Sequence, residues 1–167
     1  MTPRLRILDV RTGLAALAGL IWALAFPKPN WSGLAWIAPG LILGATMAVP
    51  SRCTFRLGYA AGLVHYLISL HWLVFNPFPV GAVAGWLALS GYLALYPATW
   101  AWVCHRFRPR SPPSGVSENG LSVNPKTVPA WAATLTSVSW AQRVRWGLAC
   151  AAAWVGLEIV RGRLFTG

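Results

Sequence analysis

The amino-acid sequence predicts an all-α fold, in which about five transmembrane helices form a polytopic bundle. Hydrophobic residues make up 56% of the 167 residues, charged residues only 10%, and the mean hydropathy is +0.54. Soluble domains carry about 25% charged residues, so this chain has too few polar side chains to cover a soluble fold. The apolar residues also gather in long stretches separated by connectors rich in proline or arginine, as in integral membrane proteins.

The first apolar segment, residues 13–26, follows three arginines and is shorter than the about 20 residues that a full span needs. A basic start followed by a short apolar core also describes a cleaved signal peptide, and this alternative stays open. We favour a first transmembrane helix because further apolar segments follow almost at once. Pro27 and Pro29 end it, and the second segment, residues 31–49, contains Pro39, which predicts a kink.

The third and fourth apolar segments cover residues 57–75 and 81–104. A short basic loop, residues 50–56, separates the third segment from the second. The fourth segment carries no charge and is interrupted by Pro97. Together with the first two segments they predict four transmembrane helices within residues 1–104.

Residues 105–145 form a long basic loop. Its first part is rich in proline, serine and glycine, which predicts a flexible linker. Its last part, residues 129–145, is either a helix lying along the membrane surface or a solvated loop. A fifth transmembrane helix covers residues 146–167, and we expect the chain to stop at the tip of this helix, before a further domain.

The distribution of basic residues predicts the orientation. The net charge is +11, from 14 lysines and arginines against three acidic residues. With the N-terminus inside, eleven of the fourteen fall on the inner side, as the positive-inside rule requires. Five spans then place the C-terminus outside. The same pattern accounts for the high charge without a nucleic-acid partner, since no nucleic-acid recognition motif accompanies it.

Three pairs of glycines at four-residue spacing are candidates for close helix packing. They are Gly40 with Gly44, Gly58 with Gly62, and Gly81 with Gly85. Such pairs let two helices approach closely in lipid. We favour packing within the chain over a dimer interface.

Polar residues at the predicted outer end are candidates for contacts with substrate or with another domain. Glu158 and Arg161 are spaced i, i+3 and can pair on one face of a helix. Charges within a span are costly, so the pair either fixes the depth of the helix or contacts a headgroup or a following domain. Trp72 lies near the outer end of the third segment and is a third candidate.

No pattern of residues predicts catalysis, a metal or a cofactor within the chain. The sequence has no phosphate-binding glycine loop and no nucleophile–base motif. His65 and His71 are six residues apart and lie on different faces of one helix. Cys53, Cys104 and Cys150 have no close partner in sequence and are expected to be small packing residues.

Several stretches, in order, resemble one known family, bacterial apolipoprotein N-acyltransferase. They are ALAFPKPN (23–30) with LAWIAP (34–39), GYAAG (58–62) leading to HWL (71–73), YLALYP (92–97) and AWVGLEIVRGRLFTG (153–167). The last stretch is the most specific. The resemblance covers nearly the whole chain except residues 105–145.

The resemblance implies a function at the bacterial inner membrane. Enzymes of this family transfer a fatty acyl chain from a phospholipid to the amino group of a lipoprotein's diacylglyceryl cysteine, through a cysteine thioester. Their catalytic cysteine, glutamate and lysine belong to a nitrilase-like domain on the outer face, and none of the cysteines of this chain matches that nucleophile. The chain would therefore anchor such a domain and help admit phospholipid and lipoprotein substrates, without being active alone.

Two alternatives remain from the residues themselves. One is a non-catalytic membrane scaffold or small transporter, although a transporter is expected to show an internal repeat that is not visible here. The other is a truncated product without a function of its own.

Overall fold

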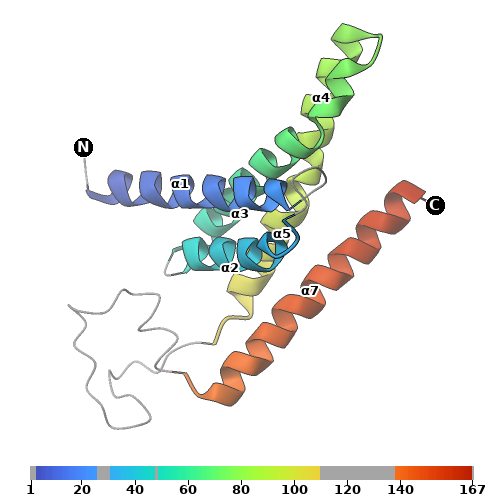
Figure 1. Cartoon of the computed structure of the whole chain (residues 1–167). Coiled ribbons are helices and arrows are strands. Elements are labelled where there is room, and N and C mark those ends of the chain that lie inside the picture. The colour runs from blue at the N-terminus through green and yellow to red at the C-terminus, as the bar shows by residue number, and fades with distance from the viewer. Residues whose placement is uncertain (1–2, 26–30, 48, 110–137, 167) are drawn as a thin grey trace.

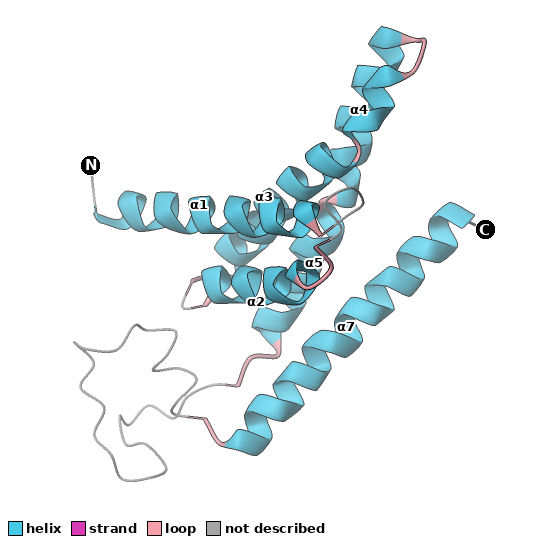
Figure 2. Cartoon of the chain, in the orientation of Figure 1, coloured by secondary structure: helices cyan, strands magenta, loops and turns pink. Residues whose placement is uncertain are grey.

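The part of the chain that the structure describes is entirely helical. The computed structural model describes residues 3–25, 31–47, 49–109 and 138–166, and these contain helices, turns and no strand (Figures 1 and 2). The all-α prediction is confirmed for these residues. The connector at residues 27–30 and most of the predicted flexible linker lie outside them.

The helices follow the predicted apolar segments in order. They are α1 (Pro3–Leu24), α2 (Leu34–Thr46), α3 (Ser51–Ser69), the 3₁₀-helix η1 (His71–Phe75), α4 (Pro79–Leu93), α5 (Leu95–Arg106) and α7 (Trp140–Thr166). Segment three corresponds to α3 with η1, and segment four to α4 with α5. The hairpin formed by η1 and the start of α4 projects beyond the other helices, at the top of Figure 1.

Three helices begin earlier than the apolar pattern indicated. Residues 51–56, predicted as part of a loop, form the first turns of α3, with Pro50 as the extended N-cap residue. α1 and α7 likewise begin at Pro3 and Trp140, among basic residues. The reason is that arginine is a good helix former, so hydropathy marks an apolar stretch and not the first helical turn.

Prolines act differently in the two helices that contain them. The fourth segment is broken at Ala94, three residues before Pro97, because Pro97 has no N–H to donate to the carbonyl of Leu93. α2, by contrast, continues through Pro39 as one helix.

Neighbouring helices of the bundle run in opposite directions. Arg11 on α1 donates hydrogen bonds to the carbonyls of Ala45, at 3.1 Å, and Met47, so the first half of α1 lies beside the end of α2. Thr54, near the start of α3, shares a hydrogen bond of 3.3 Å with His105 at the end of α5. We call this end of α3 and α5 the loop end, and the opposite end, where η1 lies, the hairpin end.

Small residues bring α3 close to α1 on one side and to α5 on the other. A Cβ atom on Gly19 would lie 2.2 Å from the carbonyl oxygen of Ala61. A Cβ on Gly58 would lie 2.9 Å from the Cα of Ala98, and one on Gly62 would lie 2.3 Å from the ring of Pro97. Only glycine fits at these positions, so α3 is packed backbone to backbone against both neighbours.

The other predicted glycine pairs do not lie in helix contacts. No described residue of another element lies within 4 Å of where a Cβ would stand on Gly40, Gly44 or Gly85, and at Gly81 the nearest atoms belong to the ring of Phe78. The search for glycine pairs missed Gly19, although Ala15, Gly19 and Ala23 form a stripe of small residues at the same spacing.

Two tryptophans, one on α5 and one on α7, join these helices by equivalent hydrogen bonds. Trp100 of α5 donates its indole N–H to the carbonyl of Cys150 on α7, at 2.9 Å. Trp146 of α7 donates to the carbonyl of Cys104 on α5, also at 2.9 Å. Each helix carries the same Trp-x-x-x-Cys spacing, so the two antiparallel helices exchange equivalent bonds.

Two helical stretches are long and apolar enough to cross a membrane. They are Ser51–Phe75 and Pro79–Arg106, and only 33% and 17% of their most apolar windows are buried. A core helix of a soluble protein would be covered on most sides, whereas these stretches expose apolar side chains. Val10–Leu24 and Leu34–Thr46 are shorter apolar helices. α7 is 27 residues long, but basic residues near its start and charges near its end lower its hydropathy.

Replacing Gly19 by alanine tests the α1–α3 contact. We expect Gly19→Ala to lower the free energy of unfolding by about 1–3 kcal/mol, because the added methyl group meets a backbone carbonyl that has no space to move. The control is Gly13→Ala in the same helix, where nothing lies within 4 Å. It should leave stability unchanged or raise it by up to about 1 kcal/mol through helix propensity. Unfolding in mixed micelles, followed by circular dichroism, measures both, and equal effects would refute the close approach.

Candidate functional site

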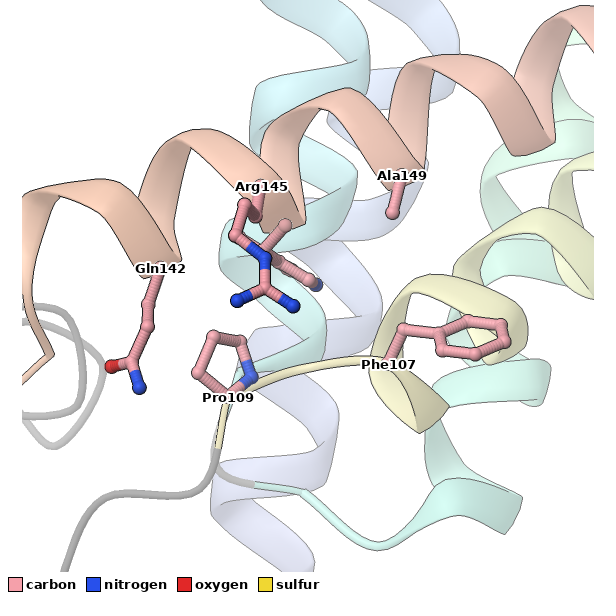
Figure 3. A pocket seen from close by; sticks show the side chains of 6 residues that line it. Phe107, Pro109, Gln142, Arg145 and Ala149 are labelled. Atoms are coloured by element: carbon pink, nitrogen blue, oxygen red, sulfur yellow. The ribbon is translucent and has the colours of Figure 1, made fainter.

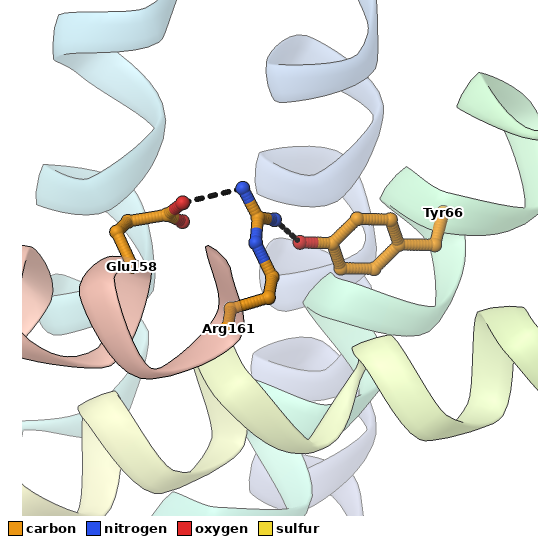
Figure 4. Close-up of polar contacts among 3 residues, drawn as sticks. All are labelled: Tyr66, Glu158 and Arg161. Carbon is orange, nitrogen blue, oxygen red and sulfur yellow. Dashed lines mark hydrogen bonds and ion pairs between the residues drawn. The ribbon is translucent and has the colours of Figure 1, made fainter. Parts of the chain in front are cut away.

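A polar network joins α7 to α3 towards the hairpin end. Arg161 forms an ion pair with Glu158, one turn earlier on α7. Its other terminal nitrogen donates a hydrogen bond of 2.9 Å to the hydroxyl of Tyr66 on α3, as Figure 4 shows. The side chains of Arg161 and Glu158 are 33% and 37% exposed. The network is therefore half-buried and reachable from one side.

A cluster of packed aromatic rings lies beneath this network. Trp22 of α1 stacks on His65 of α3, with ring centroids 4.1 Å apart, and lies 5.2 Å from Trp154 of α7. The rings of His65 and Tyr66 are 4.7 Å apart, and Trp154 also meets Trp100 of α5 at 5.1 Å. Four helices thus meet behind the ion pair. This packing orients Tyr66 so that its hydroxyl faces Arg161.

A small cavity lies beside the network, between α7 and the α4–α5 break. It has a volume of about 210 Å³ and is lined by Tyr92, Leu95, Tyr96, Thr99 and Leu157. The hydroxyls of Tyr92 and Tyr96 share a hydrogen bond of 3.0 Å. The chemistry available here is hydrogen bonding from phenols next to a guanidinium, which suits an ester or phosphate oxygen.

A second cavity lies at the loop end, between the end of α5 and the start of α7. It has a volume of about 310 Å³, and Phe107, Pro109, Gln142, Arg145, Trp146 and Ala149 line it. Figure 3 shows the guanidinium of Arg145 turned from α7 towards Pro109. With one cation, one amide and two aromatic rings, this cavity offers binding groups but no nucleophile or base.

The structure brings together two of the three predicted contact residues. Glu158 and Arg161 pair as their i, i+3 spacing indicated. Trp72 stands apart on η1, 61% exposed, and makes no contact with them. Tyr66 was missed, because it lies 95 residues before Arg161 in an otherwise apolar segment. A tyrosine next to a histidine within an apolar segment was the available signal.

The cysteines and histidines form no metal-binding cluster in the described part of the chain. Cys104 and Cys150 are buried in the core, whereas Cys53 is half-buried on α3. His65 is buried against Trp22, and His71 is exposed, with its ring nitrogen 2.8 Å from the carbonyl of Ile68.

The chain belongs to the apolipoprotein N-acyltransferase N-terminal domain family. The model of that family matches residues 18–167. This match includes α2 to α7, the last seven residues of α1 and the whole Tyr66–Arg161–Glu158 network. This match confirms the resemblance to the family that the sequence stretches indicated.

The curated relatives that match this chain are named apolipoprotein N-acyltransferase, and some of them match most of it. The apolipoprotein N-acyltransferase of Chromobacterium violaceum is 31% identical over 162 residues, which cover 92% of this chain and 25% of that protein. That of Rhodopirellula baltica is 33% identical, covering 92% of this chain and 23% of the relative. That of Geobacter metallireducens is 39% identical over 99 residues, or 56% of this chain and 19% of the relative. The chain thus spans about a quarter or less of these relatives. No solved structure matches it.

A double-mutant cycle tests the link between α3 and α7. We expect Tyr66→Phe and Arg161→Met to be coupled by about 1 kcal/mol in the free energy of unfolding, because each removes one partner of the same charge-assisted hydrogen bond. The control pairs Tyr66→Phe with Arg163→Met, an exposed arginine on the same helix. This second cycle should be additive, and equal coupling in both cycles would contradict the assigned bond.

Proposed function

We propose that this chain is the membrane-embedded N-terminal part of an apolipoprotein N-acyltransferase. The enzyme would move a fatty acyl chain from a phospholipid to the N-terminal amino group of a lipoprotein's diacylglyceryl cysteine. The observation that carries the proposal is the family match over residues 18–167, together with relatives of that name four or more times as long as the matched part.

The proposed orientation places five spans in the bacterial inner membrane, with the N-terminus inside and the C-terminus outside. The charge count supports this orientation, since basic residues gather at the loop end. The alternating helix directions support it too, because they put the start of α1 and the end of α7 at opposite ends of the bundle. The Tyr66–Arg161–Glu158 network then faces the outer side.

The role that we assign to this network is to hold the outer end of α7 in a fixed position. The resemblance implies that a nitrilase-like catalytic domain lies on the outer face. Tethering α7 to α3 through Arg161 would fix where that domain begins relative to the membrane. The same guanidinium, half-exposed beside the Tyr92–Tyr96 cavity, is also placed to contact an acyl-ester or phosphate oxygen of an entering lipid.

The hairpin tip provides a second contact with lipid. Trp72, Phe75 and Phe78 are 61%, 80% and 75% exposed around η1 and the start of α4. Aromatic rings at this depth favour the membrane interface. We propose that Trp72 lies among outer-leaflet headgroups, on the side from which lipid substrates approach.

Residues 1–167 alone are expected to carry no acyltransferase activity. The family's catalytic cysteine, glutamate and lysine lie in the nitrilase-like domain, and Cys104 and Cys150 are buried away from the network. Purified chain incubated with phospholipid should therefore form no hydroxylamine-sensitive acyl thioester. Detection of such a thioester by mass spectrometry would overturn this part of the proposal.

A chimeric enzyme tests the proposed function directly. Residues 18–167 would replace the matching segment of the full-length Chromobacterium violaceum enzyme, in bacteria depleted of their own N-acyltransferase. We expect growth to be restored and lipoproteins to carry the third acyl chain, as read by mass spectrometry. Arg161→Met in the chimera should reduce N-acylation about tenfold, the loss expected for about 1.4 kcal/mol of positioning energy, whereas Arg163→Met should not.

The outcomes separate the alternatives. If the chimera inserts at normal levels but never supports N-acylation, the acyltransferase assignment is wrong, and a scaffold or transporter role takes its place. If N-acylation is restored but Arg161→Met has no effect, the family role stands and the role of the network falls.

A further inference from the structure

A further cavity at the loop end lies between the start of α3 and the end of α5. It has a volume of about 580 Å³ and is lined by Ser51, Arg52, Phe55, Arg56, Thr99 and Trp102. It lies on the same end as the Thr54–His105 hydrogen bond and opposite the Tyr66–Arg161 network. Of its lining residues, only Thr99 also borders the Tyr92–Tyr96 cavity beside Arg161.

Two arginines one turn apart give this cavity a strong positive charge. Arg52 and Arg56 lie on one face of α3. Within the described residues, neither guanidinium has a hydrogen bond or an ion pair. The sequence also has no acidic residue between Asp9 and Glu118, and Glu158 pairs with Arg161 at the other end. Glu158 is the one acidic residue whose side chain the structure describes, so the described side chains provide no counter-charge at the loop end.

Three other arginines of the bundle, Arg11, Arg143 and Arg161, use their donors internally. Arg11 binds the carbonyls that end α2, and Arg143 donates to the carbonyl of Val138 at 2.9 Å. Arg52 and Arg56 do neither, although they border a cavity. Two free planar donor groups at this spacing suit a phosphate, which accepts paired hydrogen bonds from guanidinium.

The remaining walls of the cavity are apolar or weakly polar. Trp102 is 43% exposed beside the arginines, Phe55 is half-buried, and the hydroxyls of Ser51 and Thr99 complete the lining. A free anion would gain nothing from the two rings. A ligand that joins an anionic phosphodiester to hydrocarbon would satisfy both parts of the site.

We propose that this cavity binds the headgroup of an anionic phospholipid of the inner leaflet. The phosphodiester would lie between Arg52 and Arg56, the glycerol would reach Ser51, and an acyl chain would run along Trp102. This lipid is distinct from the acyl donor, because the site is at the opposite end of the bundle from Arg161. The proposal depends on the membrane orientation proposed above but not on acyl transfer.

Native mass spectrometry of the full chain tests the site. The protein, released from detergent micelles, would be titrated with phosphatidylglycerol and, separately, with phosphatidylcholine of the same acyl chains. We expect one tightly bound phosphatidylglycerol and no comparable phosphatidylcholine adduct. In Arg52→Gln/Arg56→Gln the affinity for phosphatidylglycerol should fall about 30-fold, as expected for two basic contacts at a membrane surface.

A control variant removes the same charge elsewhere. Arg145→Gln/Arg163→Gln loses two positive charges, one of them in the other loop-end cavity, and should bind phosphatidylglycerol like the unaltered chain. An equal loss in both variants would overturn the proposal in favour of diffuse charge attraction. Circular dichroism of each variant confirms that the helices are intact. If Arg52→Gln/Arg56→Gln does not fold, preference of the unaltered chain for phosphatidylglycerol, and its loss in Trp102→Ala, decide the question.

Inorganic phosphate distinguishes a lipid from a simple anion. Millimolar phosphate should not displace bound phosphatidylglycerol, because it lacks the part that contacts Trp102 and Phe55. Displacement by phosphate at such concentrations, or equal binding of both lipids, would overturn the assignment. Since no arm measures N-acylation, failure here leaves the proposed acyltransferase role untouched.

Discussion

The close packing of α3 between α1 and α5 is the constraint on which the rest of the bundle depends. In lipid there is no hydrophobic drive between helices, so association relies on contact at short range. Gly19 lets α1 reach the backbone of Ala61, and Gly58 and Gly62 let α5 reach α3. Each site has no room even for a methyl group. Once α3 is fixed on both sides, the positions of Tyr66 and Thr54, and hence of both ends of the bundle, are fixed as well.

The helix break before Pro97 and the glycine at position 62 together make the contact between α5 and α3. A helix that contained proline without a break would keep an unpaired carbonyl and a steric clash at that turn. The chain instead interrupts the helix at Ala94, and the space above Gly62 receives both the proline ring and the Ala94 backbone. A feature that weakens α4–α5 as a helix thus becomes the surface by which α5 packs on α3.

The sequence alone predicted the helical class, the order of the apolar segments and the Glu158–Arg161 pair, because all three depend on local spacing and composition. It did not predict the partners that join distant segments. Arg11 was counted only as a topology signal, yet it binds the end of α2, 34 and 36 residues away. Tyr66 and the Trp100–Cys150 bond follow from how the helices cross, which periodicity does not specify. Helix starts were also placed too late, because arginine-rich first turns resemble loops in hydropathy.

The two ends of the bundle differ in how their charges are balanced, and this difference constrains what each end can do. At the hairpin end, Arg161 forms an ion pair with Glu158 and donates a hydrogen bond to Tyr66. The bond to Tyr66 holds α7 against α3. A neutral, ordered end is suited to present a further domain in a defined place. At the loop end, Arg52 and Arg56 have no hydrogen bond or ion pair with the described residues, and desolvating them without a counter-ion is costly. Their balance must come from the surroundings, and in a membrane the nearest abundant anion is a lipid phosphate. The positive-inside pattern is thereby more than a signal for orientation, because it leaves specific cations, beside aromatic walls, available to the leaflet that surrounds them.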